Sequence, residues 1–245
     1  MAGDAHHPNM AEENPTEDLV SEIGASIHAV RTEARNVVLT YDDGPQPGGT
    51  KQVLEALAEY GATATFFVLL TRVRRYRRLF ANVAKAGHEI GLHGMDHRRL
   101  PELDPADIES RTNDARCELQ DLLGRAVIWF RSPYGAQSLD TWHAVARTGM
   151  THVLWSHSLK DWMDVPAGTR HDIALDSARP GSIILAHDGY ASREDGAYDG
   201  KPPKIDRGEL TRNLLQVYQE RDLSGCSLTR ALKEGDPVMR VRLTH

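Results

Sequence analysis

The chain has 245 residues, of which 40% are hydrophobic and 26% are charged, a composition typical of one globular domain with a sizeable core. Its formal net charge of −6 provides no overall positive field, so we expect no nucleic acid among its partners. The longest apolar run, residues 63–70, is too short to cross a bilayer, and we expect no transmembrane segment.

The N-terminal segment, residues 1–33, begins as a polar and acidic stretch. We expect a tail followed by a short helix here, ahead of a single domain over residues 34–245. The segment lacks the basic start and apolar centre of a secretory signal. The sequence as written therefore predicts a cytoplasmic protein, whereas a chain that had lost a signal peptide would be secreted or held at the cell surface.

From residue 36 onward, short apolar runs alternate with amphipathic segments. The apolar runs show no polar alternation, as expected for strands covered on both faces, and they lie at 37–41, 63–70, 88–93, 126–130, 151–156, 182–187 and 226–232. The segments with helical spacing lie at 51–61, 77–87, 104–124, 139–149, 170–178 and 210–222. This βα alternation predicts an α/β fold with about seven parallel strands, in a sheet that is either open or closed into a barrel.

Side chains suited to acid–base or metal chemistry stand at or just after the C-terminal ends of most expected strands. They are Asp42, Asp43, His93, His97, Arg131, Asp161 and His187. The carboxyl ends of parallel strands share one face of a wound sheet or barrel, where active sites are built. We therefore expect these side chains to meet at one site.

The adjacent carboxylates Asp42 and Asp43 suggest a metal ion, whose charge would offset their mutual repulsion. Successive side chains of a strand point to different sides, so one carboxylate can bind the ion while its neighbour faces a water molecule on it. If the chain turns helical after His93, the i, i+4 spacing places His93 and His97 on one helix face. Two His and one Asp would leave a zinc-like ion open to water and substrate, as a hydrolytic site requires.

The chain resembles the metal-dependent polysaccharide deacetylases of the NodB-homology, carbohydrate esterase type. The resemblance covers residues 36–235 and rests on TYDDGP (40–45), HGMDH (93–97), RSPYG (131–135), WSHSLKDW (155–162) and ILAH (184–187). It implies a distorted (β/α) barrel of about seven parallel strands. It also implies a hydrolase that removes N-acetyl groups from amino sugars of a chitooligosaccharide, a peptidoglycan-type or another glycan.

The resemblance assigns a metal centre and a base. Asp43, His93 and His97 would hold one divalent metal ion, zinc as the first expectation and cobalt, nickel or manganese as alternatives. Asp42 would be the general base, and Arg131 would orient it.

The resemblance also assigns an acid and the substrate contacts. His187 would be the general acid, oriented and charge-stabilised by Asp161. The backbone N–H of Tyr134 would help hold the oxyanion, and Trp162 and Leu185 would form an apolar slot for the acetyl methyl group.

One departure from the family concerns the loop over residues 93–97, called the metal loop below. Gly94 stands where the family has Ser or Thr, whose hydroxyl braces that loop, so the sequence predicts either a weaker metal site or a different brace. A second unusual feature is a run of five arginines at 72, 74, 75, 77 and 78. This run fits either a patch for an anionic substrate or a solvated loop and first helical turn.

Two alternatives compete with a glycan deacetylase. The absence of a signal and the long polar segment 188–208 fit a related amide or imide hydrolase acting on a small intracellular metabolite. An inactive sugar-binding module would have no physical need for the complete set of acid–base and metal residues. The sequence does not indicate an oligomeric state.

Overall fold

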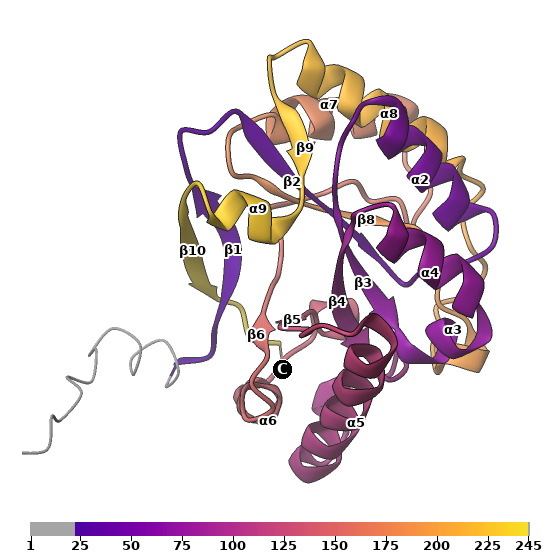
Figure 1. Ribbon diagram of the computed structural model, residues 1–245, viewed down its shortest axis with the longest axis vertical. Coiled ribbons are helices and arrows are strands. Elements are labelled where there is room, and N and C mark those ends of the chain that lie inside the picture. The colour runs from indigo at the N-terminus through magenta and orange to yellow at the C-terminus, as the bar shows by residue number, and fades with distance from the viewer. Residues whose placement is uncertain (1–22, 245) are drawn as a thin grey trace, which may run out of the picture.

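The computed structural model describes residues 23–244, shown in Figure 1. The part of the expected N-terminal tail and helix that falls on residues 1–22 lies outside the described residues. Among the residues that the structure describes, none of the helices combines the length and the hydropathy that crossing a membrane requires.

The framework is a sheet of seven parallel strands curled into a half-barrel, which confirms the predicted α/β fold. In spatial order the strands are β6 (Thr151–His152), β5 (Trp129–Phe130), β4 (Glu89–Gly94), β3 (Thr65–Leu69), β2 (Asn36–Asp42), β8 (Ile183–His187) and β7 (His157–Ser158). A further strand, β9 (Ser224–Cys226), pairs in parallel with the start of β2. β2 lies near the middle of the sheet, and every residue of it is buried.

Helices cover the outside of the sheet (Figure 1). They are α2 (Gly49–Glu59), α3 (Leu70–Arg75), α4 (Arg77–Lys85), α5 (Pro105–Leu123), α6 (Leu139–Ala146), α7 (Ala167–Ser177) and α8 (Arg207–Gln219). The short helix α9 (Leu228–Leu232) packs on the other face of the sheet, where Leu228 and Ala231 share a buried cluster with Val38 and Phe67. Short 3₁₀ turns occur at Leu100–Glu102 (η1), Pro133–Gly135 (η2) and Arg193–Asp195 (η3). The local sequence explains the limits of α5, because Asp104 accepts a hydrogen bond from the N–H of Ala106 and Gly124 ends the helix at φ 64°.

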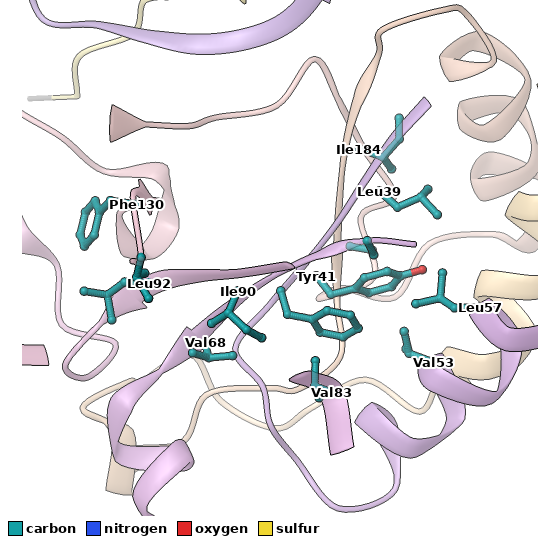
Figure 2. Packing of buried hydrophobic residues seen from close by; sticks show 14 of the residues in the cluster. Leu39, Tyr41, Val53, Leu57, Val68, Val83, Ile90, Leu92, Phe130 and Ile184 are labelled. Carbon is teal, nitrogen blue, oxygen red and sulfur yellow. The ribbon is translucent and has the colours of Figure 1, made fainter. Parts of the chain in front are cut away.

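The larger core cluster lies between the sheet and the outer helices. Figure 2 shows Leu39 and Tyr41 of β2 beside Val53 and Leu57 of α2. Because the strand side chains on this face are buried under helices, the apolar run at the start of β2 holds the strand in place up to the polar residues at its end.

Two parts of the fold differ from the sequence prediction. The strand predicted over 226–232 is wrong beyond Cys226, because Leu228–Leu232 forms α9 and buries Leu228 and Ala231 at helical spacing. Strand β1 (Ala25–Arg31) lies within the segment expected to be tail and helix, and pairs antiparallel with β10 (Asp236–Val241). The partners of this pair are about 200 residues apart, so no local sequence signal predicts their pairing. We propose that β1 belongs to the domain predicted over 34–245.

The helix-covered core predicts the effect of truncating a side chain. Leu57→Ala removes a fully buried side chain from α2, and we expect the free energy of unfolding to fall by about 2–5 kcal/mol. Leu122→Ala in α5, where the side chain is 40% exposed, should change it by no more than about 0.5 kcal/mol. Urea denaturation of the two variants makes the comparison, and equal losses would contradict the assignment of the core.

Candidate active site

Strand register brings the predicted site residues to one edge of the sheet. β2 and β8 pair with Asp42 opposite His187, and β4 and β5 pair with Leu92 opposite Phe130, which places the residues that follow them side by side. A pocket of about 500 Å³ opens at this edge. Of the ten predicted site residues, the pocket is lined by eight, which are Asp42, Asp43, His93, His97, Tyr134, Trp162, Leu185 and His187.

The metal triad predicted from the sequence is brought together. One potential ligand atom from each of Asp43, His93 and His97 lies within 4.8 Å of the other two, and all three residues are buried. Oδ1 of Asp43 lies 3.5 Å from Nε2 of His93 and 3.2 Å from Nε2 of His97. The same Oδ1 has no hydrogen-bond partner among the described residues, an unfavourable state for a buried carboxylate unless a cation binds it. The donor set therefore fits a divalent cation.

The protonation states of His93 and Asp43 also favour a metal site. Burial lowers the pKa of His93 to about 4, and its Nδ1 lies 2.8 Å from the carbonyl oxygen of Arg131, which leaves Nε2 as the free acceptor. Burial opposes the ionisation of Asp43, but the neighbouring imidazoles, His97 first, hold its pKa well below the usual range. At neutral pH these two residues are therefore in the forms that bind metal.

The loop between the two histidines is not helical, so the helical spacing suggested for them is wrong. Residues 95–97 form a bend, and Gly94 has φ 118°, a conformation that favours glycine. A Cβ on residue 94 would lie 2.9 Å from the carbonyl oxygen of Asp96. The histidines still converge, with ring centroids 5.3 Å apart, because the bend returns the chain toward β4.

Arg131 lies behind the pocket and is fully buried. Its Nη1 donates to Oδ1 of Asp42 at 2.8 Å and to Oγ1 of Thr40 at 2.7 Å. The guanidinium also lies 4.1 Å from the ring centroid of Phe67 and donates to two backbone carbonyls. Oδ2 of Asp42 is left facing the triad, 3.9 Å from Nε2 of His93. The geometry expected for an oriented base is therefore present.

The fully buried Asp161 and His187, whose side chain is 14% exposed, form a second pair. Oδ1 of Asp161 lies 2.7 Å from Nδ1 of His187, and Oδ2 accepts the backbone N–H of His187 at 2.8 Å. Burial opposes the charged imidazole, but the Asp161 carboxylate outweighs it, and with the more distant Asp43 and Asp42 raises the pKa of His187 to about 9. His187 is therefore protonated at neutral pH, the form that a general acid requires.

Arg207, at the start of α8, was not predicted as part of the site. Its Nη1 donates to Oδ2 of Asp161 at 2.9 Å and to the carbonyl oxygen of His187 at 2.7 Å. The residue lies 20 positions after His187 and outside any motif, so the sequence offered no signal for it.

Three predicted substrate contacts line the pocket wall. Tyr134 has φ 62°, and its ring meets that of His97 edge-on at 4.3 Å. Trp162 is 38% exposed, and its ring centroid lies 5.5 Å from that of His187. Leu185 lies deeper, on β8. The oxyanion role of the Tyr134 N–H and the acetyl slot of Trp162 and Leu185 stay predictions.

The polar segment 188–208, which follows His187, forms one wall of the pocket. Tyr190, Ala191 and Asp199 line the pocket. The N–H of Ala191 donates to Oδ2 of Asp43 at 3.2 Å, and the hydroxyl of Tyr134 donates to Oδ2 of Asp199 at 2.8 Å. In the sequence, the one indication that this segment contributes to the pocket was its position directly after His187.

Comparison with known proteins identifies the family of the chain. Residues 29–153 match the Polysaccharide deacetylase family, and the chain belongs to that family. A chitooligosaccharide deacetylase of Azorhizobium caulinodans is 34% identical over 187 residues, covering 76% of this chain and 89% of the relative. A peptidoglycan-N-acetylglucosamine deacetylase of Bacillus cereus is 33% identical over 159 residues, covering 64% of this chain and 74% of the relative.

A solved structure is similar as well. The peptidoglycan deacetylase PdaC from Bacillus subtilis superposes with a TM-score of 0.68 at 26% identity, covering 82% of this chain and 91% of that chain. The half-barrel is therefore an architecture that it shares with this relative.

The triad predicts how metal affinity responds to loss of a ligand. His93→Ala removes one of three ligand side chains, and we expect the affinity for Zn²⁺ to fall by more than about 100-fold. His171→Ala, an exposed position on α7, should leave affinity unchanged. Competitive titration with a chromophoric chelator measures both, and equal affinities in the two variants would exclude the triad as the metal site.

Proposed function

We propose that this chain hydrolyses the N-acetyl groups of N-acetylated amino sugars, in a chitooligosaccharide, a peptidoglycan-type or another glycan. The observation that carries the proposal is the meeting of a metal triad, an arginine-held carboxylate and a charged histidine around one pocket. Membership of the polysaccharide deacetylase family supports it, as do relatives named as deacetylases of chitooligosaccharides and peptidoglycan.

We propose Asp43, His93 and His97 as the ligands of one divalent cation, zinc first, with cobalt, nickel or manganese as alternatives. Two imidazoles and a carboxylate suit these metals and leave coordination positions open. A cation bound there would lower the pKa of a water molecule and polarise the acetyl carbonyl.

Side chains and one backbone N–H of the protein would carry out the remaining steps. Asp42, oriented by Arg131, would take a proton from the attacking water as its oxygen adds to the acetyl carbon. The N–H of Tyr134 would donate to the oxyanion of the tetrahedral intermediate. His187 would protonate the departing nitrogen, so that acetate and a free amine leave together, and Asp161 would hold its ring in place.

The pocket wall combines charged groups with apolar surface. Among the described residues, its lining includes the carboxylates Asp42, Asp43 and Asp199 and the charged imidazole of His187. Trp162 and Leu185 add apolar surface that fits a methyl group and a sugar face. We infer that the acetyl group and one face of the sugar contact this apolar surface.

Acetate release from a substrate panel tests the proposal. We expect release from chitooligosaccharides, stimulated by added Zn²⁺ or Co²⁺, and a loss of about 100-fold or more in kcat for Asp42→Asn. Peptidoglycan fragments and small amides and imides complete the panel. Turnover confined to the small amides or imides would favour the alternative metabolite hydrolase, and full activity of Asp42→Asn would exclude Asp42 as the base.

The Asp161–His187 pair predicts the alkaline limb of the pH–rate profile. Because Asp161 raises the pKa of His187, the charged acid persists at neutral pH and is lost as the pH rises through the folded-state pKa, which is about 9. Asp161→Asn removes the main stabilising charge, so we expect the alkaline limb of kcat/KM to move to lower pH and kcat to fall. Asp164→Asn, an exposed neighbour, is the control. An alkaline limb that stays in place in a folded Asp161→Asn protein would show that His187 is not the acid.

A further inference from the structure

His97 lacks the support that a metal-binding histidine normally has. Its Nδ1 is buried and finds no hydrogen-bond partner within residues 23–244, whereas Nδ1 of His93 is held by the carbonyl of Arg131. The second ring nitrogen of a metal-bound histidine usually bonds to a carboxylate, carbonyl or water, which fixes the ring. Gly94 has no hydroxyl to brace the loop, and its backbone conformation leaves no room for one. Something else must therefore fix His97.

The segment after β8 holds the backbone of His97 instead of its ring. The backbone N–H of His97 donates to the carbonyl oxygen of Asp195 at 2.6 Å. The same segment holds a second ligand residue, because the N–H of Ala191 donates to Asp43. On the other side of the loop, the N–H of Thr71 donates to the carbonyl oxygen of Met95 at 3.0 Å. The metal loop is thus held between the start of α3 and the turn at Asp195.

Asp195 is itself fixed by a buried ion pair. Its side chain is fully buried and accepts from Nε and Nη2 of Arg72 at 3.0 and 2.8 Å. Thr71 and Ser192 donate to the same carboxylate, the latter through its N–H at 3.0 Å and its hydroxyl at 3.1 Å. Such charge-assisted bonds from a planar guanidinium fix orientation as well as distance.

This pair also revises the interpretation of the arginine run. Arg72 is 4% exposed and also donates to Gln46 and to the carbonyl of Tyr190, so it is neither a free anion-binding group nor solvated. Arg74 and Arg75 form ion pairs with Glu118 and Glu194. The buried member of the run therefore has a structural task at the site.

We propose that Asp195, locked by Arg72, is a positioning residue that fixes His97 and thereby sets the metal affinity of the site. Its carbonyl holds the backbone of His97 in place of a hydroxyl at residue 94. The proposal rests on the metal site of the proposed function. Without the lock, the turn and His97 must be ordered when the metal binds, and that ordering lowers affinity.

Metal titration tests the proposal without reference to turnover. We expect Asp195→Asn to weaken Zn²⁺ binding by about 10- to 100-fold, the range typical of lost outer-shell contacts. Ser192→Ala, which removes the hydroxyl contacts to Asp195 and keeps the N–H contact, should weaken it by about fivefold or more, as for the loss of one or two hydrogen bonds. Arg74→Gln, which breaks an ion pair elsewhere on α3, is the matched control and should bind Zn²⁺ as the unaltered chain does. The visible spectrum of the Co²⁺ form should change for Asp195→Asn and stay constant for Arg74→Gln.

Each outcome decides the proposal. Asp195→Asn leaves Arg72 buried without a charged partner, so circular dichroism must first show a folded protein. If that variant does not fold, Ser192→Ala decides alone. Unaltered affinity and an unaltered Co²⁺ spectrum in the folded variants would overturn the role of Asp195. Absence of metal binding in the unaltered chain would instead refute the metal site, and normal metal affinities without acetate release would refute only the proposed function.

Discussion

The arrangement of the site depends on how the buried negative charge at the end of β2 is balanced by positive partners. Asp42 and Asp43 are adjacent, buried carboxyl groups at the edge of a parallel sheet, and burial of such groups is unfavourable without positive partners. Arg131 forms an ion pair with Asp42, and the imidazoles together with a bound cation would compensate the charge of Asp43. The surrounding elements serve to bring those partners to one edge: β4 carries His93, β5 leads into Arg131, and β8 carries His187.

The surroundings of His93 and His187 give the two imidazoles different protonation states. Burial keeps His93 neutral, as the proposed metal ligand must be, whereas the Asp161 carboxylate keeps His187 charged, as the proposed proton donor must be. The same residue type acquires opposite properties because burial outweighs the attraction of Asp42 and Asp43 at His93, whereas the attraction of Asp161 outweighs burial at His187. Arg207 holds this second pair in place by donating to Asp161 and to the carbonyl oxygen of His187.

The sequence predicted the parts of the molecule whose signals are local. The buried strand ending in Asp42 and Asp43 and the capped helix α5 were predicted because apolar runs, caps and glycine stops are read within a few residues. The site residues could be gathered because parallel strands share one carboxyl edge. Strand β1 could not be predicted, since its partner β10 lies at the other end of the chain. The pairing of Arg72 with Asp195 was missed for the same reason, because it joins segments 123 residues apart and the arginine run gave no indication of its partner.

The most direct measurement is anomalous diffraction from crystals of this chain grown with Zn²⁺. The account predicts one strong zinc peak with Asp43, His93 and His97 as its protein ligands, and the carboxylate of Asp42 facing the open side of the ion. A zinc ion bound elsewhere, or one that lacks Asp43 as a ligand, would contradict it.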